Sequence, residues 1–107
     1  MKLMGGKKAF AARLEHAMDN KLIDYGNEPS FWALRTFNHA GRPDLTSKWV
    51  HWIMNHNYDT TGVTGNDDTG AMSSCYIFSA FGFFPDAGQN VYYLNAPLYK
   101  SFISFNY

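Results

Sequence analysis

The chain has 107 residues, 46% of them hydrophobic and 18% aromatic, so it can bury one modest core and is too short for several domains. Nine basic and nine acidic side chains cancel, which excludes the positive field that a nucleic-acid partner requires. The longest apolar run, residues 76–81, is far shorter than the roughly 20 residues of a membrane span, so we expect no membrane partner. The single cysteine, Cys75, excludes an internal disulfide and predicts a small buried hydrophobe.

Three amphipathic helices are predicted in the first half of the chain. Apolar residues repeat at helical spacing over residues 7–19, and again over residues 30–39, where Gly41 supplies a stop signal. A third helix, which we expect Asp44 to cap, extends to His56 and carries an unusually aromatic face.

The second half predicts a long loop, one more helix and short strands. Residues 58–70 are so rich in Gly, Asp and Thr that we expect a loop without helix or strand. Residues 71–81 predict a fourth helix, apolar nearly all round and therefore buried on most sides, with Gly82 ending it. Aromatic and β-branched residues predict strands over 91–94 and 99–105. The expected fold class is mainly α, about four helices followed by a short C-terminal β segment.

Two polar islands carry most of the functional information: Gly26-Asn27-Glu28-Pro29-Ser30 and Gly65-Asn66-Asp67-Asp68-Thr69-Gly70. Glycine and proline fix the path of a loop, while Asn, Asp and Glu present oxygen atoms to a cation or a polyol. A sugar site is therefore the first hypothesis. Because Glu28 precedes a proline, we expect it to be extended, with its side chain free to point into a site.

Simpler explanations exist for each of these features. Asp67 or Asp68 can cap the fourth helix, and Glu28 can be a solvated loop residue. The second island lacks the ligand spacing of an EF-hand, so any calcium must collect ligands from separate loops. The four histidines lack zinc-site spacing. Aromatic residues such as Trp49 and Trp52 can stack on sugars, but rings at helical spacing usually belong to the core.

These islands, together with Ala40-Gly41-Arg42-Pro43 and the stretch from Met72-Ser73 to Phe84-Pro85, resemble glycoside hydrolase family 92 in the same order along nearly the whole chain. The family consists of calcium-dependent, exo-acting α-mannosidases. The resemblance implies inverting hydrolysis of terminal α-mannose, an N-terminal β-sandwich and an (α/α)6 barrel. Residues 1–107 would form part of that barrel, with residues 91–107 as its terminal strands, and without the β-sandwich and the first part of the barrel.

The resemblance also assigns roles to residues. It implies that Asp68 is the general base and that Asn66 assists it, that Glu28 and Asp67 contact the mannose, and that Asn27, Glu28 and Asp68 hold calcium. The family's general acid is a glutamate in a segment that precedes the first island, and we expect this chain to lack it.

The chain departs from the family pattern at several positions. Phe31, Ala71 and Cys75 stand where the family usually has His, Gln and Trp. Calcium-assisted sugar binding without turnover, and an inactive remnant that self-associates through exposed aromatic residues, therefore remain as alternatives. The expected partner is a mannose-containing glycan. Family members are commonly secreted or periplasmic, although no export signal is visible around Gly5-Gly6-Lys7-Lys8.

Overall fold

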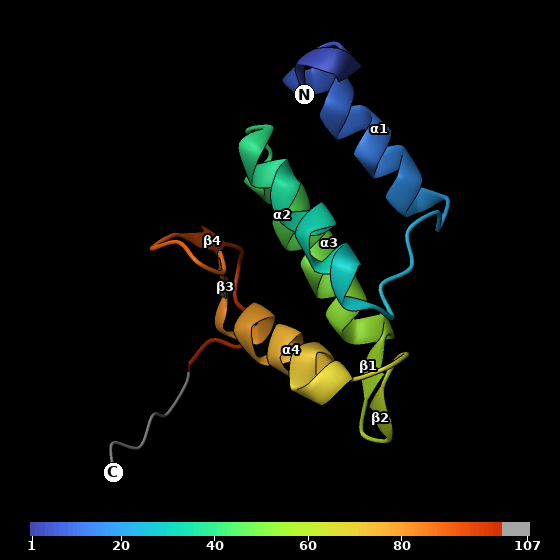
Figure 1. Cartoon of the computed structure of the whole chain (residues 1–107), viewed down its shortest axis with the longest axis vertical. Helices are drawn as coiled ribbons and strands as arrows, with labels where there is room; N and C mark the ends of the chain where they lie inside the picture. The colour runs from blue at the N-terminus through green and yellow to red at the C-terminus, as the bar shows by residue number, and fades with distance from the viewer. Residues whose placement is uncertain (102–107) are drawn as a thin grey trace.

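The computed structural model describes residues 1–101 and confirms a mainly helical fold with a short β segment (Figure 1). Its helices are α1 (Lys7–Asp19), α2 (Phe31–His39), α3 (Pro43–His56) and α4 (Ala71–Phe81). The short 3-10 turns η1 (Lys2–Met4), η2 (Glu28–Ser30) and η3 (Asp68–Gly70) precede α1, α2 and α4. All four predicted helices are present, with ends that agree within two residues. No helix among the described residues is both long and apolar enough to cross a membrane.

The centre of the molecule is the pair α2–α3, whose helices lie side by side and run in opposite directions (Figure 1). Helix α1 packs beside this pair, and α4 crosses near its other end. The buried apolar cluster is formed by Ala11, Met18, Tyr25, Leu34, Phe37, Ala40, Leu45, Trp49, Val50, Ile53 and Met54. Phe37 and Val50 are completely buried, at 0% exposure, so side-chain packing holds these helices together.

The prediction that residues 58–70 contain no regular structure is wrong. Strands β1 (Tyr58–Asp59) and β2 (Gly62–Val63) pair as a short antiparallel hairpin. One oxygen of the Asp59 carboxylate accepts hydrogen bonds from the backbone N–H and the hydroxyl of Thr61, at 2.7 and 2.6 Å. The composition correctly predicted turn residues in this segment. The turn formed by Asp59 and Thr61, however, is tight enough that the residues on either side of it pair as strands.

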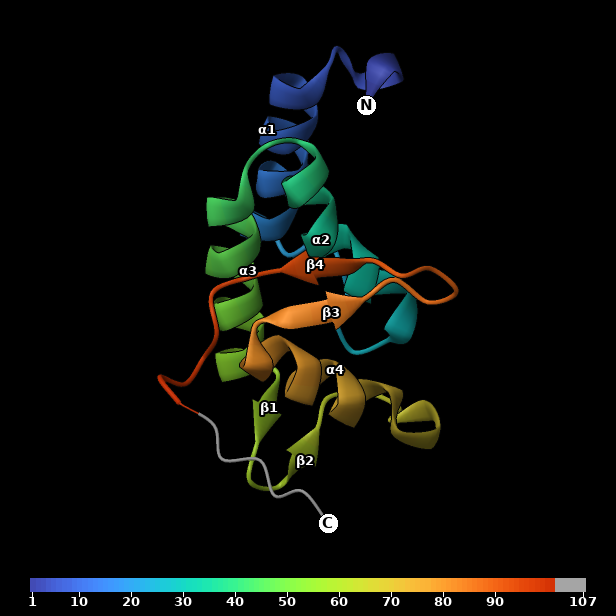
Figure 2. The same ribbon diagram turned by 90° about the vertical axis from the view of Figure 1, so that its left-hand side faces the viewer.

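A second hairpin joins β3 (Phe83–Pro85) to β4 (Tyr92–Leu94), with Phe84 opposite Tyr93. Strand β3 packs against α4, and β4 packs against α2 (Figure 2). The strand predicted at 91–94 is confirmed within one residue, whereas β3 was not predicted, because its proline argues against a strand. Of the strand predicted at 99–105, residues 99–101 form no strand, and 102–105 lie outside the described residues.

Two further expectations need correction. Helix α4 buries Met72 and Cys75, but Ile77 and Phe81 are 52% and 42% exposed, so the helix is not enclosed on most sides. Asp44 does not cap α3, because Pro43 begins the helix one residue earlier. Instead, the Asp44 carboxylate accepts a hydrogen bond from Nε of Arg42 at 2.8 Å, and this ion pair lowers the pKa of the carboxyl group.

Candidate functional site

The two polar islands touch each other through their backbones. A methyl group added at Gly65 would overlap the carbonyl oxygen of Gly26 and would lie 2.8 Å from its carbonyl carbon. Gly65 also has a φ of +72°, in the left-handed region. Only glycine meets both conditions, because every other residue carries a Cβ atom. The chain therefore brings the first loop, residues 26–30, and the second loop, residues 65–70, into direct contact.

Short-range hydrogen bonds shape the first loop. The Asp24 side chain accepts the backbone N–H of Gly26 at 2.8 Å, and the Asp24 carbonyl accepts the hydroxyl of Ser30. Asn27 is extended, with φ −146° and ψ 144°, and its side-chain oxygen accepts the N–H of Glu28 at 2.9 Å. Glu28 itself begins η2, so the prediction of an extended Glu28 is wrong. The cap from Asn27 favours the helical turn more than Pro29 disfavours it.

In the second loop, Asp67 supplies capping hydrogen bonds at the start of α4, although Gly70 occupies the N-cap position itself. One oxygen of its carboxylate accepts the backbone N–H and the hydroxyl of Ser73, at 2.9 and 3.0 Å. Its carbonyl oxygen accepts the N–H groups of Gly70 and Ala71. The capping explanation therefore holds for Asp67, which has one carboxylate oxygen left for other contacts.

Asp68 has a different environment from Asp67. It and Thr69 have φ angles of +45° and +64°, a conformation that is uncommon for residues other than glycine. Such backbone strain occurs often at functional sites. The side chains of Asp68, Asn66 and Glu28 are exposed, and within residues 1–101 none of them has a hydrogen-bond partner. Three oxygen-bearing side chains on two touching loops are thus free to bind a ligand.

A preassembled metal cage is not present in the described part of the chain. No three His, Cys, Asp or Glu side chains there converge closely enough to hold an ion. The donors are nevertheless of the right kind for calcium, since carboxylate and carboxamide oxygens are its usual protein ligands. The two loops therefore present free oxygen atoms but do not form a closed metal site.

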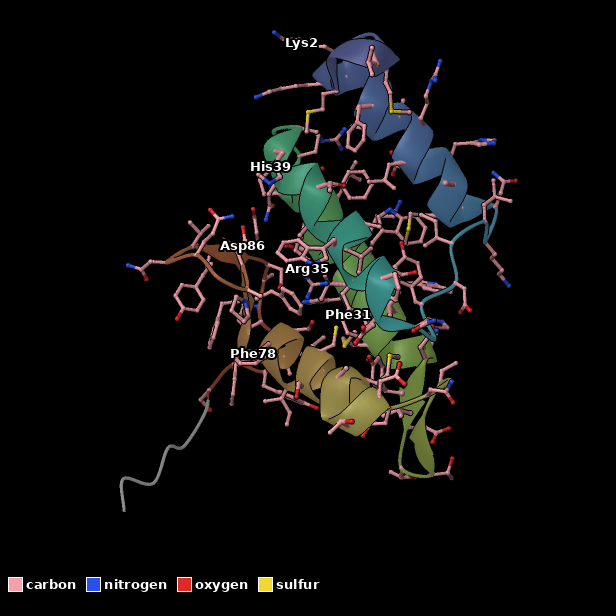
Figure 3. All side chains as sticks on the ribbon, in the orientation of Figure 1. Lys2, Phe31, Arg35, His39, Phe78 and Asp86 are labelled. Carbon is pink, nitrogen blue, oxygen red and sulfur yellow. The ribbon has the colours of Figure 1, made fainter. Side chains whose placement is uncertain are left out.

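Sequence reasoning missed a buried arginine on α2, Arg35. Arg35 is 1% exposed, donates a hydrogen bond to the Ser79 hydroxyl at 2.6 Å, and places its guanidinium 4.3 Å from the ring centre of Phe84 (Figure 3). Burial lowers the pKa of Arg35 and raises the pKa of the neighbouring Cys75 thiol. These contacts join α2 to α4 and β3. An arginine within an amphipathic helix gives no sequence signal of burial, because most arginines are exposed.

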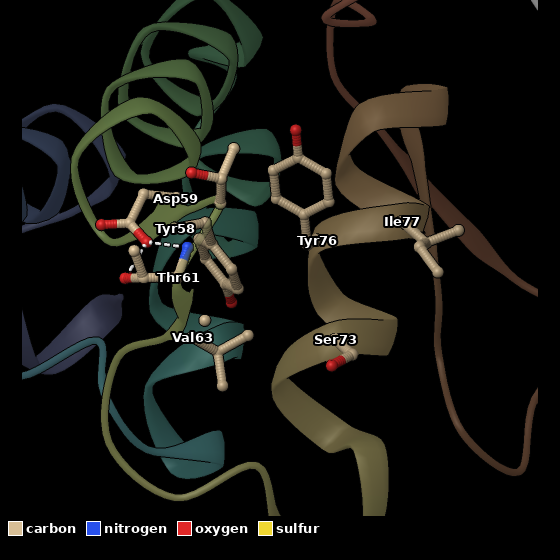
Figure 4. Close-up of a pocket in the computed structure, with 9 residues that line it drawn as sticks. Tyr58, Asp59, Thr61, Val63, Ser73, Tyr76 and Ile77 are labelled. Atoms are coloured by element: carbon tan, nitrogen blue, oxygen red, sulfur yellow. Dashed lines mark hydrogen bonds between the residues drawn. The ribbon is translucent and has the colours of Figure 1, made fainter.

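A cavity of about 560 Å³ lies between the β1–β2 hairpin and α4 (Figure 4). Ser73, which binds Asp67, is one of its lining residues. Most of its polar groups are already paired: Thr61 binds Asp59, and the Tyr76 hydroxyl lies 2.9 Å from the Tyr99 hydroxyl. The cavity therefore offers a ligand mainly apolar surface.

The fold and the two loops define a class of helical domains with free surface oxygen atoms, which are the kind of donors that a cation or a polyol requires. Comparison with known families narrows this class. The model for the glycosyl hydrolase family 92 catalytic domain matches residues 1–104. An "uncharacterized secreted glycosidase" of Arthroderma benhamiae is 44% identical over 101 residues, which cover 92% of this chain.

The chain belongs to glycoside hydrolase family 92, as the sequence motifs predicted. It spans 13% of the length of the Arthroderma relative.

Proposed function

We propose that this chain is part of a secreted glycosidase that removes terminal α-linked mannose with inversion and with calcium assistance. Family membership and the secreted glycosidase from Arthroderma support the glycosidase and its location. The observation that carries the proposal is the backbone contact between Gly26 and Gly65, because the two loops that it joins are the ones that carry the free oxygen atoms. We also propose that the four helices are a portion of an (α/α)6 barrel.

Asp68 is the proposed general base. Its carboxylate is exposed and has no partner among residues 1–101, so it is free to accept a proton from water. Inverting glycosidases separate the acid from the base by roughly 6.5–9.5 Å, which leaves room for that water. Asn66, two residues earlier, is proposed to orient the water. The constrained backbone at Asp68 and Thr69 would hold the carboxylate in a defined direction.

Glu28 and the unengaged oxygen of Asp67 are the proposed contacts to the mannose hydroxyls. The side-chain oxygens of Asn27, Glu28 and Asp68 are the proposed calcium ligands, and hydroxyls or waters would complete the set because no cage is preassembled among residues 1–101. When bound, calcium supplies positive charge that polarises the oxygen atoms it contacts. The Asn27 oxygen already accepts the Glu28 N–H, which fixes its direction and leaves one lone pair for the ion.

The test is release of mannose from α-linked mannobiose by the protein that contains this chain, with and without calcium. Asp68→Asn should lower turnover by about 10²–10⁴-fold, the usual contribution of general-base catalysis. Asparagine tolerates the left-handed conformation, so the backbone should be preserved. Ser74→Ala, at an exposed position of α4, is the matched control and should retain full turnover. Equal turnover by Asp68→Asn and the unmodified protein would remove Asp68 from the role of base.

A further inference from the structure

Thr64 lies at the junction where the two loops meet. It directly precedes Gly65, and a Cβ atom built on Gly26 would lie 3.3 Å from the Thr64 methyl carbon. The same Cβ atom would lie 3.1 Å from a carboxylate oxygen of Asp24. Two side chains therefore fill the space beside Gly26, and Thr64 is the one that comes from the second segment. The proposed function does not use Thr64.

The polar groups of Thr64 anchor it to the end of α3. Its backbone N–H donates to the carbonyl oxygen of Asn57 at 3.2 Å, and its hydroxyl donates to the same oxygen. Asn57 directly follows α3, and its own N–H donates to the Ile53 carbonyl at 2.8 Å. Carbonyl groups at the end of a helix lack partners within the helix, so they accept such bonds. Ile53 is 2% exposed, so Thr64 is tied to a helix that is fixed in the core.

The second loop is thereby fixed at both ends. Thr64 ties its start to α3, and the Asp67 carboxylate ties its end to α4 through Ser73. Asn66 and Asp68 lie in this loop, and their exposed side chains have no hydrogen-bond partner within residues 1–101. The direction of these side chains therefore depends on the loop backbone, and the loop backbone depends on the two anchors.

We propose that Thr64 is a positioning residue for the reaction, an inference that rests on the proposed function. Its hydroxyl holds the second loop against α3, which keeps the Asp68 carboxylate in place to activate water. Catalysis is sensitive to such placement, because a displacement of about 1 Å can lower the rate about 10²-fold. In this role Thr64 acts through the loop and has no contact with the sugar.

The experiment measures release of mannose from α-linked mannobiose by the protein that contains this chain, with calcium present. Thr64→Val keeps the branched side chain and the backbone hydrogen bond but removes the hydroxyl. It should lower kcat about tenfold and change KM by less than about twofold, because the displaced base acts on water and not on the bound sugar. Thr64→Ser keeps the hydroxyl and should restore kcat to within about threefold of the unmodified protein.

Thr61→Val is the matched control. Thr61 lies in the turn of the same β1–β2 hairpin, and its hydroxyl donates to the Asp59 carboxylate at 2.6 Å. Within residues 1–101, the hydrogen bonds of this side chain go to Asp59 and not to either loop. The two valine variants should lower the melting temperature by similar amounts, because each loses one hydroxyl hydrogen bond. Only Thr64→Val should also lose turnover.

A second readout does not depend on turnover. In the nitrogen-15-labelled protein, the NMR order parameter of the Asp68 amide should fall from about 0.85 to below about 0.6 in Thr64→Val. It should stay near the value of the unmodified protein in Thr64→Ser and Thr61→Val. An unchanged order parameter in Thr64→Val would overturn the anchoring of the loop, and with it this inference, whatever the turnover.

The two readouts separate this inference from the proposed function. If the unmodified protein releases mannose and Thr64→Val keeps its kcat, the positioning role is overturned and the proposed function stands. A fall in kcat that Thr64→Ser does not restore, or that Thr61→Val shares, has the same meaning. If the unmodified protein releases no mannose but Thr64→Val loosens the Asp68 amide, the proposed function is overturned and the anchoring by Thr64 is supported. No mannose release together with an unchanged order parameter would overturn both.

Discussion

The α2–α3 pair and the two loops of the candidate site are held in place by different means. In α2–α3, side chains such as Phe37 and Val50 are completely buried and fix the helices by packing. In the loops, the candidate side chains are exposed, and the positions of the loops depend on the Gly26–Gly65 backbone contact and on the capping bonds of Asp67. The candidate site is thus specified by a few backbone positions, whereas the core is specified by many side chains. Stability and binding should therefore respond to different substitutions.

The largest expected effect on stability is in the core. Phe37→Ala should lower the free energy of unfolding by about 3–5 kcal/mol, because it removes a buried ring and leaves a cavity. That is a large part of the total of about 5–15 kcal/mol that is typical of a domain. Urea denaturation measures the change, with Leu3→Ala as an exposed control. A loss below about 1 kcal/mol would mean that α2–α3 is not packed as described.

The next effect separates binding from stability. Gly65→Ala and Gly41→Ala both place alanine at a left-handed φ, +72° and +76°, but only the first creates a steric overlap. Each should lose about 1–2 kcal/mol of stability from the backbone conformation, and Gly65→Ala about 1–3 kcal/mol more from the overlap. Only Gly65→Ala should abolish calcium-dependent mannose binding, measured by calorimetry. Equal binding by both variants would show that loop contact is not needed.

The smallest effect distinguishes two adjacent aspartates. Asp67→Ala removes the cap of α4 and should cost about 1 kcal/mol in the free energy of unfolding. Asp68→Asn should change it by less than about 0.5 kcal/mol, because the Asp68 side chain has no partner among residues 1–101. Thermal denaturation of the two variants checks the difference. A larger loss for Asp68→Asn would indicate a structural role for Asp68 instead of a free carboxylate.

The sequence by itself determined the helices, because their signals are local. Apolar spacing predicted α1 to α3, a nearly continuous apolar stretch predicted α4, and Gly82 ended α4 with a φ of +93°, as its lack of a Cβ permits. The motifs also determined the family. Within the candidate site, the sequence predicted which residues carry oxygen atoms. The hydrogen bonds of Asp24 and Asp67 could also be predicted, because an Asp side chain commonly accepts backbone N–H groups a few residues later.

Only the tertiary structure decided which segments meet. The contact between Gly26 and Gly65 joins residues 39 positions apart, and no periodicity or spacing predicts it. The burial of Arg35 against Ser79 and the hairpin formed by β3 also depend on distant partners. Local sequence fixes backbone preference within a few residues, but long-range contacts form only when packing offsets the entropy of closing the chain between them.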